Sequence, residues 1–523
     1  MQAFSRREFL QLSGAAAVLG LLPHRLLASQ DVEVVSIFHT TDLHGNVLPT
    51  ATYDGTPDVG GFARCATQIK AWRETSPRSL TVDLGDLYQG TVVGYNTQGQ
   101  VMIHALNHLD YDAWLLGNHE FDWGLDPINA AVRASRMPVL AANTLFQGKH
   151  TTAASQDGSV KPYVVKEVGG YKIVFIGLMT PGMPNWFLPE ALPGFEVQDP
   201  VATLKKLMPE IRSHQPHAVV LGTHMGIRQR SREDDAANRL DALTREVQGI
   251  DLILGAHTHQ EFAATAVNGV PYSQALYFGI CAGKVDLAFD RNTKKLVGVS
   301  SELTTMDASV EPDPSVLALA QHDLQSAEMI LQKPVGELLD ELDIVNEPGQ
   351  ASDLERLICT AIIEGLKSHG HQVDGAIHGL LYAEAGIPSG PKTIGDMWKI
   401  LPFENQTVLV DLTSEELGQM MTDFYRVRSL RSLVGLKPLV QGRGEDVRVR
   451  GFTQDGRQVD RSRRLRVALN SYDAASGGGR FEVVRELVGK VSSRRRVLPY
   501  QTRVLLTDYF LREKTVSLAK LLS

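Results

Sequence analysis

Cysteine is scarce in this sequence, and its spacing matches no common motif. Cys65, Cys281 and Cys359 lie far apart, with no CxxC pair among them. Disulfide-stapled domains and thiolate metal sites need paired or clustered cysteines, so the spacing argues against both. We interpret the three residues as small buried hydrophobic side chains.

Long apolar runs are also missing. A membrane-spanning helix needs about 20 consecutive apolar residues, and no stretch reaches that length. The apolar run at residues 12–22 follows Arg6 and Arg7 and precedes Ala28, which resembles a twin-arginine export signal. We therefore predict a signal at residues 1–30, the twin-arginine machinery as a partner, a periplasmic location and no stable span in the mature chain. A single uncleaved anchor is the alternative.

An excess of basic charge is absent, because the formal net charge is −8. A general nucleic-acid binder normally has a basic balance or a basic face, so we expect no nucleic acid as a partner. The composition, with 43% hydrophobic and 21% charged residues, is that of an ordinary globular protein. A chain of 523 residues is too long for one typical core and predicts two large domains.

Short β-branched runs alternate with segments of helical period from Val32 onward. This alternation predicts a layered α/β domain, with buried strands at residues 34–38, 79–82, 113–116, 172–177, 218–223 and 250–254. An acidic stretch with two prolines follows at residues 307–313, and residues 314–332 have the period of a helix. We predict a catalytic domain over residues 31–305, a linker with a bridging helix over 306–333, and a substrate-binding domain over 334–523.

Polar side chains follow the predicted strands at almost every exit. Loops at the carboxyl ends of strands bring distant residues of an α/β sheet together; here they carry Asp42, His44, Asp86, Asn118, His119, His224, His257 and His259. Any one of these histidines, taken alone, is more simply explained as a hydrogen-bonded core residue. Their recurrence at strand ends instead favours a metal site.

The chemistry of this set indicates the type of metal. Oxygen donors and imidazoles without thiolates suit divalent Mn, Zn, Fe or Mg. Six ligands are too many for one ion in a small site but suit two ions that share a carboxylate. Two ions roughly 3.5–4 Å apart can hold a bridging hydroxide and bind phosphoryl oxygens.

These motifs resemble the calcineurin-like metallophosphoesterases, and within them the periplasmic 5′-nucleotidase and UDP-sugar hydrolase group. The resemblance rests on the segments at residues 41–44, 85–86, 117–122, 222–224, 255–259, 401–405 and 470–481. It implies an N-terminal four-layer α/β/β/α metallophosphoesterase domain and a C-terminal α/β 5′-nucleotidase-type domain joined by the bridging helix.

The resemblance also implies a role for each site residue. One metal ion is expected to bind Asp42, His44, Asp86 and His259, and the other Asp86, Asn118, His224 and His257, with Asp86 bridging. His119 occupies the position that meets the leaving group, and Asp122 is expected to orient it. We expect Glu120 to face the interior or a backbone amide rather than substrate.

The second domain differs from the family at the positions that are expected to bind substrate. Its relatives usually have a Gly-Gly-x-Arg segment whose arginine binds phosphate, but residues 378–384 contain no arginine. Phe481 matches one of two aromatic residues that stack on a nucleobase, and Asn470 is a second expected substrate contact. No ring occurs at residues 436–440, where the other is expected. Positive charge could be restored by Arg426, Arg428, Arg431, Arg443 and Arg480.

The sequence therefore predicts an exported phosphohydrolase that uses two divalent metal ions and a metal-bound hydroxide to cleave a small phosphoester, with a nucleotide as the expected substrate. Two alternatives remain open at this point. One is the thiosulfate-oxidation hydrolase of the same superfamily, and the other is a non-catalytic protein that binds an anionic metabolite.

Overall fold

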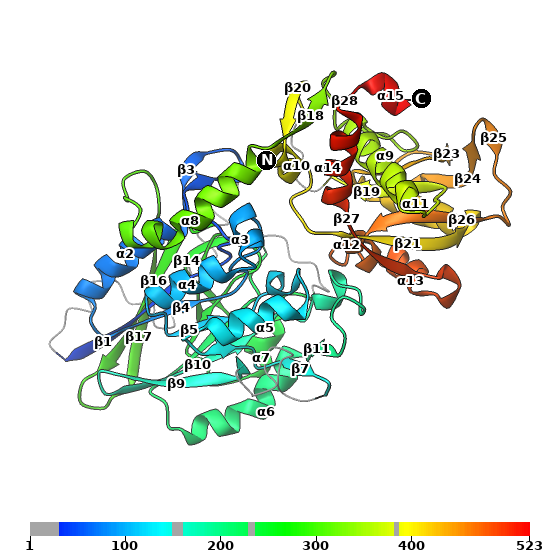
Figure 1. The fold of residues 1–523 in the computed structure, drawn as a ribbon. Coiled ribbons are helices and arrows are strands. Elements are labelled where there is room, and N and C mark those ends of the chain that lie inside the picture. The colour runs from blue at the N-terminus through cyan, green and yellow to red at the C-terminus, as the bar shows by residue number, and fades with distance from the viewer. Residues whose placement is uncertain (1–30, 149–159, 229–235, 381–385, 523) are drawn as a thin grey trace. The chain divides into compact units, whose positions relative to one another are not determined.

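The computed structural model describes residues 31–148, 160–228, 236–380 and 386–522. The predicted export signal at residues 1–30 lies outside these ranges, as do residues 381–384 of the segment that lacks the expected arginine. The described chain forms two compact units (Figure 1). The first comprises residues up to 183 together with 194–325, and the second comprises residues 184–193 together with those from 326 onward.

The first unit contains two large sheets. In the first sheet, five parallel strands are extended at one edge by two antiparallel ones. Its order is β17 (Leu296–Thr305), β16 (Cys281–Asp290), β1 (Val32–Thr40), β4 (Ser79–Asp83), β5 (Ala113–Leu115), β6 (Val139–Leu140) and β8 (Val160–Lys161).

The second sheet has four parallel strands between two antiparallel edge strands. Its order is β14 (Glu261–Val267), β15 (Val270–Ala275), β13 (Leu252–Leu254), β12 (Ala218–Thr223), β10 (Tyr171–Leu178) and β9 (Tyr163–Val168).

Alternation of side chains along the strands builds the layers. Val35 and Ile37 of β1 pack with residues of β10, β12 and β13 in the core between the sheets, whereas Phe38 points to the opposite face and contacts Trp72, with ring centroids 5.3 Å apart. Successive side chains of a strand point to opposite faces, so each sheet has a second apolar face for helices to cover.

Helices cover those outer faces and complete the predicted α/β/β/α architecture. On the side of the first sheet lie α2 (Phe62–Thr75), α4 (Gln100–His108) and α5 (Leu125–Ala134), with α3 (Val92–Asn96) nearby (Figure 1). The outer face of the second sheet packs against α6 (Pro200–Ser213) and α7 (Leu240–Glu246). Small two-stranded sheets pair β2 (Thr50–Ala51) with β3 (Pro57–Val59) and β7 (Thr144–Phe146) with β11 (Phe195–Val197).

The second unit is a separate α/β domain around a five-stranded sheet. Apolar clusters lie on both faces of this sheet. Its order is β22 (Arg431–Val434), β19 (Gly375–Gly379), β26 (Arg464–Asn470), β21 (Gln406–Thr413) and β27 (Arg496–Gln501). One face packs against α11 (Ser414–Arg426) and α13 (Glu482–Gly489), and the other against α9 (Asp353–Ser368) and α14 (Thr502–Glu513).

Smaller elements complete this unit. One three-stranded sheet has the order β20 (Gly390–Thr393), β18 (Pro334–Leu338) and β28 (Thr515–Val516). Another has the order β23 (Lys437–Gln441), β24 (Arg448–Gln454) and β25 (Arg457–Gln458). The short helices are α10 (Ile394–Ile400), α12 (Ser471–Ala475) and α15 (Leu518–Leu522).

The expected bridging helix is α8 (Pro314–Leu331), which begins in the first unit and ends in the second. The six strands predicted for the first domain are likewise confirmed, as β1, β4, β5, β10, β12 and β13. Among the described helices, none combines the length and apolar character needed to cross a membrane.

Candidate metal centre

The eight polar residues singled out in the sequence all follow the carboxyl ends of parallel strands. Asp42 and His44 come after β1, Asp86 after β4, and Asn118 and His119 after β5. From the second sheet, His224 follows β12 directly, and His257 and His259 follow β13. Both sheets of the first unit therefore contribute to one site.

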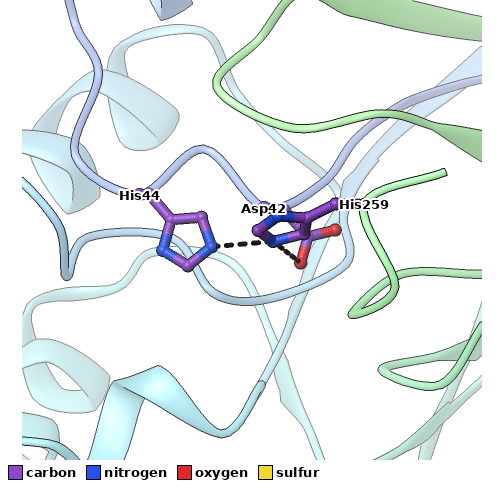
Figure 2. A group of neighbouring side chains, drawn as sticks. All are labelled: Asp42, His44 and His259. Carbon is purple, nitrogen blue, oxygen red and sulfur yellow. Dashed lines mark hydrogen bonds and ion pairs between the residues drawn. The ribbon is translucent and has the colours of Figure 1, made fainter. Parts of the chain in front are cut away.

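One cluster consists of Asp42, His44 and His259, whose possible ligand atoms all lie within 4.8 Å of one another. Figure 2 shows a ring nitrogen of His44 directed at a ring nitrogen of His259, beside the carboxylate of Asp42. The Nε2 atoms of His44 and His259 are 3.1 Å apart, and His259 Nε2 lies 3.4 Å from Asp42 Oδ1.

A second cluster consists of Asp86, His224 and His257, also within 4.8 Å. His224 Nε2 lies 3.0 Å from Asp86 Oδ2 and 3.9 Å from Asp42 Oδ1. His44 Nε2 lies 3.9 Å from the same Asp86 oxygen. The carboxylate of Asp86 is therefore close to a histidine of each cluster, as the expected bridging ligand would be.

Hydrogen bonds fix the tautomers of two of these histidines. The Nδ1 atoms of His44 and His224 lie 2.8 Å from the backbone carbonyls of Gln89 and Leu84. A carbonyl only accepts hydrogen bonds, so Nδ1 carries the proton in each ring. Nε2 is then the atom directed into the cluster, and it offers a lone pair to a cation whenever the ring is neutral.

Burial keeps two of the histidine rings in the neutral form that can bind a cation. It lowers the pKa of His44 and His257 to about 3, so both imidazoles are neutral at ordinary pH. Burial raises the pKa of Asp86, but the neighbouring positive charges of His224 and His119 lower it more, to well below its usual range. Burial also lowers the pKa of His224, but the charge of Asp86 raises it more, to about 9. The site thus combines the neutral imidazoles of His44 and His257 with the ionised carboxylate of Asp86, which is paired with His224.

The backbone at the site adopts an uncommon conformation. Asp42, His44, Asp86, His257 and His259 all have positive φ angles, between 49° and 70°. Left-handed backbone is rare for non-glycine residues and clusters at functional sites, where the surrounding fold enforces it. Five of the candidate ligands are therefore held in this uncommon backbone conformation.

Glycine makes the close approach of two strand-end loops possible. A Cβ atom at position 117 would lie 2.7 Å from Cε1 of His224. Glu120 then joins the loops, because its buried carboxylate accepts hydrogen bonds from the backbone N–H groups of Gly117, Asp86 and Leu87. The expectation that Glu120 faces backbone amides is confirmed.

His119 and Asp122 form a pair beside the two clusters. His119 Nδ1 lies 2.7 Å from Asp122 Oδ2, and the His119 side chain is 25% exposed. Burial lowers the pKa of His119, but the charges of Asp122 and Asp86 raise it more, to about 10. The ring is therefore held protonated, with Nδ1 bonded to the carboxylate.

The residues present fit a pair of divalent cations. The amide oxygen of Asn118 is buried and has no hydrogen-bond partner among the described residues, although a buried polar atom normally has one. It belongs to the residue expected to complete the ligand set of the second cluster. A donor set of carboxylate, amide and imidazole groups without thiolates matches the ions expected from the sequence.

The expected substrate residues of the second unit are buried. Phe481 has no exposed surface and packs edge to face on Phe424, with ring centroids 4.8 Å apart. The guanidinium of Arg431 lies 4.7 Å from the centroid of the Phe481 ring, and that of Arg480 lies 5.5 Å away. In this structure Phe481 therefore offers no ring face to a base.

Arg431 is held in place by its own partners. Its Nε and Nη2 atoms lie 2.8 and 2.7 Å from Asp473 Oδ1. Asn470, the other expected contact, is 1% exposed and donates to Asp473 Oδ2 at 2.8 Å. Of the other arginines considered, Arg426, Arg428, Arg443 and Arg480 are exposed.

Reasoning from the sequence missed Tyr53. Its hydroxyl lies 2.9 Å from Nδ1 of His259. No sequence signal could have identified it, because it is a single tyrosine in a polar loop that precedes the first helix.

Two known families match this chain in succession. Residues 35–261 match the calcineurin-like phosphoesterase family, and residues 334–486 match the 5′-nucleotidase C-terminal domain. The first match contains every residue of the two clusters, together with Asn118, His119 and Asp122.

Individual proteins are similar to this chain over most of its length. The chain is 24% identical to the trifunctional nucleotide phosphoesterase protein YfkN of Bacillus subtilis, over 92% of this chain but only 38% of that protein. It is 26% identical to a snake venom 5′-nucleotidase of Naja atra, over 74% of this chain and 77% of that protein. The 5′-nucleotidase precursor of Thermus thermophilus has the same fold, with a TM-score of 0.70 at 24% identity over 92% of this chain and 97% of that one.

Proposed function

Because the chain belongs to the calcineurin-like phosphoesterases that carry a 5′-nucleotidase C-terminal domain, we propose that it is a phosphohydrolase that binds two divalent metal ions and cleaves small phosphoesters of the nucleotide type. Two clusters of carboxylate and imidazole groups lie side by side, with His224 3.0 Å from Asp86 and 3.9 Å from Asp42. This convergence carries the proposal.

The ions would be held by Asp42, His44, Asp86 and His259 on one side and by Asp86, Asn118, His224 and His257 on the other. When bound, such ions neutralise the charge of phosphoryl oxygens and lower the pKa of a water molecule. Asp86 is suited to the shared position, since it is buried and close to His44 and His224.

His119 is assigned the proton donor to the leaving oxygen. Its Nδ1 is bonded to Asp122, so the proton on Nε2 is the one available to substrate. A positioned general acid contributes about 10²- to 10⁴-fold to a rate. Asp122 keeps the ring protonated and oriented, and Glu120 fixes the loop that carries both.

We propose nucleotides as the first candidate substrates, because the relatives include a nucleotide phosphoesterase and a 5′-nucleotidase. The burial of Phe481 under Arg431 weighs against tight selection of the base. We therefore propose that the phosphoester is recognised more strongly than the base.

A hydrolysis screen tests this assignment. Purified protein is stripped with a chelator, reloaded with Mn²⁺ or Zn²⁺, and assayed with nucleoside monophosphates, UDP-sugars, cyclic nucleotides, sugar phosphates and an aryl phosphate. We expect metal-dependent release of phosphate from at least one class. Absence of bound metal together with no hydrolysis of any ester would refute the proposal.

The His119→Ala variant separates an enzyme from a binding protein. An enzyme should lose most of its turnover and keep its metal content, whereas a binding protein should keep its ligand affinity. A thiosulfate-oxidation hydrolase would instead cleave a sulfur ester of a carrier and leave every phosphoester intact.

Export by the twin-arginine route is proposed from the sequence of residues 1–30 alone. Replacing Arg6 and Arg7 together by lysine should retain the protein in the cytoplasm. Immunoblots of periplasmic and cytoplasmic fractions provide the measurement, and unchanged periplasmic protein would contradict the proposal.

A further inference from the structure

Tyr53 occupies an unusual place beside the first cluster. It lies in the loop between β2 and β3, and its side chain reaches His259, with 2.9 Å between the hydroxyl and Nδ1. Two contacts with Tyr277 hold it there. The Tyr53 backbone N–H donates to the Tyr277 hydroxyl at 3.1 Å, and the two rings stack with centroids 4.3 Å apart.

The partner of His259 differs in kind from those of the other fixed histidines. His44 and His224 donate to backbone carbonyls, which only accept and so allow a single tautomer. A tyrosine hydroxyl both donates and accepts. His259 can therefore carry its proton on either ring nitrogen and keep a hydrogen bond to Tyr53.

Both tautomers have a use at this site. Nε2 of neutral His44 is an acceptor 3.1 Å from Nε2 of His259. Without a cation, His259 can donate from Nε2 to His44 while Tyr53 donates to Nδ1. With a cation on Nε2, the proton must sit on Nδ1, where the oxygen of Tyr53 can accept it.

We propose that Tyr53 is a positioning residue for the first metal ion: it accepts the Nδ1 proton of His259 and thereby directs Nε2 to the ion. The inference rests on the proposed function, because it presupposes that the first cluster binds a cation. Outer hydrogen-bond partners of this type typically change metal affinity by about 10- to 100-fold.

The experiment compares Tyr53→Phe with Tyr277→Phe in the full chain. The first change removes the hydroxyl that meets His259. The matched control removes the hydroxyl that holds the same loop and leaves the contact with His259 in place. Each protein is stripped of metal and titrated with Mn²⁺ by calorimetry, and the thermal midpoints of the stripped proteins verify that both variants are folded.

We expect the native protein to bind two ions. Tyr53→Phe should weaken one site about 10- to 100-fold and leave the other unchanged, whereas Tyr277→Phe should have a clearly smaller effect. Two unchanged sites in Tyr53→Phe, or equal weakening in both variants, would overturn this inference alone. A native protein that binds no Mn²⁺ would overturn the proposed metal site and this inference with it.

Discussion

At the scale of single residues, the contact between His119 and Asp122 keeps the His119 ring protonated. Replacing Asp122 by asparagine keeps the size of the side chain but removes the charge that raises the pKa of His119. The proposed proton donor works only while protonated, and it loses its proton as pH rises through its pKa. We expect kcat to fall about tenfold or more and its alkaline limb to move to lower pH.

The measurement is kcat as a function of pH for both proteins, loaded with the same metal. Metal content should not change, because Asp122 is not among the proposed ligands. An alkaline limb at the same pH in both proteins would show that Asp122 does not set the protonation of His119.

Arg431 yields a second prediction at this scale, about substrate choice. Removing the arginine alone would leave the Asp473 carboxylate buried without its partner, at a cost of about 3–5 kcal/mol. The test is therefore the double variant Arg431→Leu with Asp473→Asn, which removes both charges and the guanidinium that lies over the Phe481 ring. Stacking is worth about 1–3 kcal/mol per base, so selectivity for the base should rise about 5- to 150-fold.

The quantity to compare is kcat/KM for AMP relative to ribose 5-phosphate, which carries the phosphate without a base. In the native protein we expect the ratio to be small, and in the double variant larger. A native protein that already prefers AMP by a large factor would show that Phe481 becomes available without these substitutions.

The sequence was most informative about residues whose position follows from a strand end. Asp42, Asp86 and His224 each come within three residues of a strand, so recognising the strand was enough to place them together. Phe481 shows the limit of this approach. Its ring is buried against Phe424 and Arg431, which lie 57 and 50 positions earlier and whose side-chain directions no local pattern determines.

At the scale of elements, α8 begins with a capped turn. Asp313 accepts hydrogen bonds through Oδ1 from the backbone N–H groups of Ser315 and Val316, at 3.0 and 3.1 Å, and through Oδ2 from Lys70 of α2 at 2.6 Å. Burial raises the pKa of Asp313, but the hydrogen bonds from Lys70 and Ser315 lower it more, to about 2.

Asp313→Ala should therefore destabilise the first unit by about 1–2 kcal/mol at neutral pH. A carboxyl whose pKa is lowered on folding stabilises the protein above its unfolded pKa of about 3.9, and this contribution fades as pH falls toward 2. Urea denaturation at pH 7 and pH 3 should show the difference between native and variant shrinking at the lower pH. A constant difference would indicate that the cap acts without its charge.

The sequence predicted the individual helices and strands better than it predicted how the strands pair. The strands and α8 follow from short β-branched runs and from a helical period, which are local properties of the chain. Strand order depends on contacts between distant segments, such as the pairing of β1 with β16 some 250 residues away. Local patterns do not contain that information.

At the scale of the whole molecule, the segment at residues 184–193 belongs to the second unit although the first unit flanks it in sequence. Leu188 is 6% exposed in the apolar cluster that includes Phe481 and Val484. The carbonyl of Asn185 accepts hydrogen bonds from the backbone N–H of Gly478 and from the hydroxyl of Ser476.

Leu188→Ala should accordingly lower the free energy of unfolding of the second unit by about 2–4 kcal/mol, as expected for a buried leucine. Hydrogen exchange followed by mass spectrometry should show faster exchange in α12 and α13, with the first unit unaffected. The matched control is Leu240→Ala in α7, a buried leucine of the first unit, which should have the opposite distribution. In sequence, the segment is flanked by β10 and β11 of the first unit. Faster exchange confined to these two strands would contradict the assignment of residues 184–193 to the second unit.

This segment also bears on protein engineering. The chain passes from one unit to the other after residues 183, 193 and 325, so no single cut separates two self-sufficient modules. A fragment that ends in α8 would expose Leu188, and the complementary fragment would lack Asn185 and Leu188. Chimaeras that exchange the C-terminal domain among relatives should therefore transplant residues 184–193 together with it.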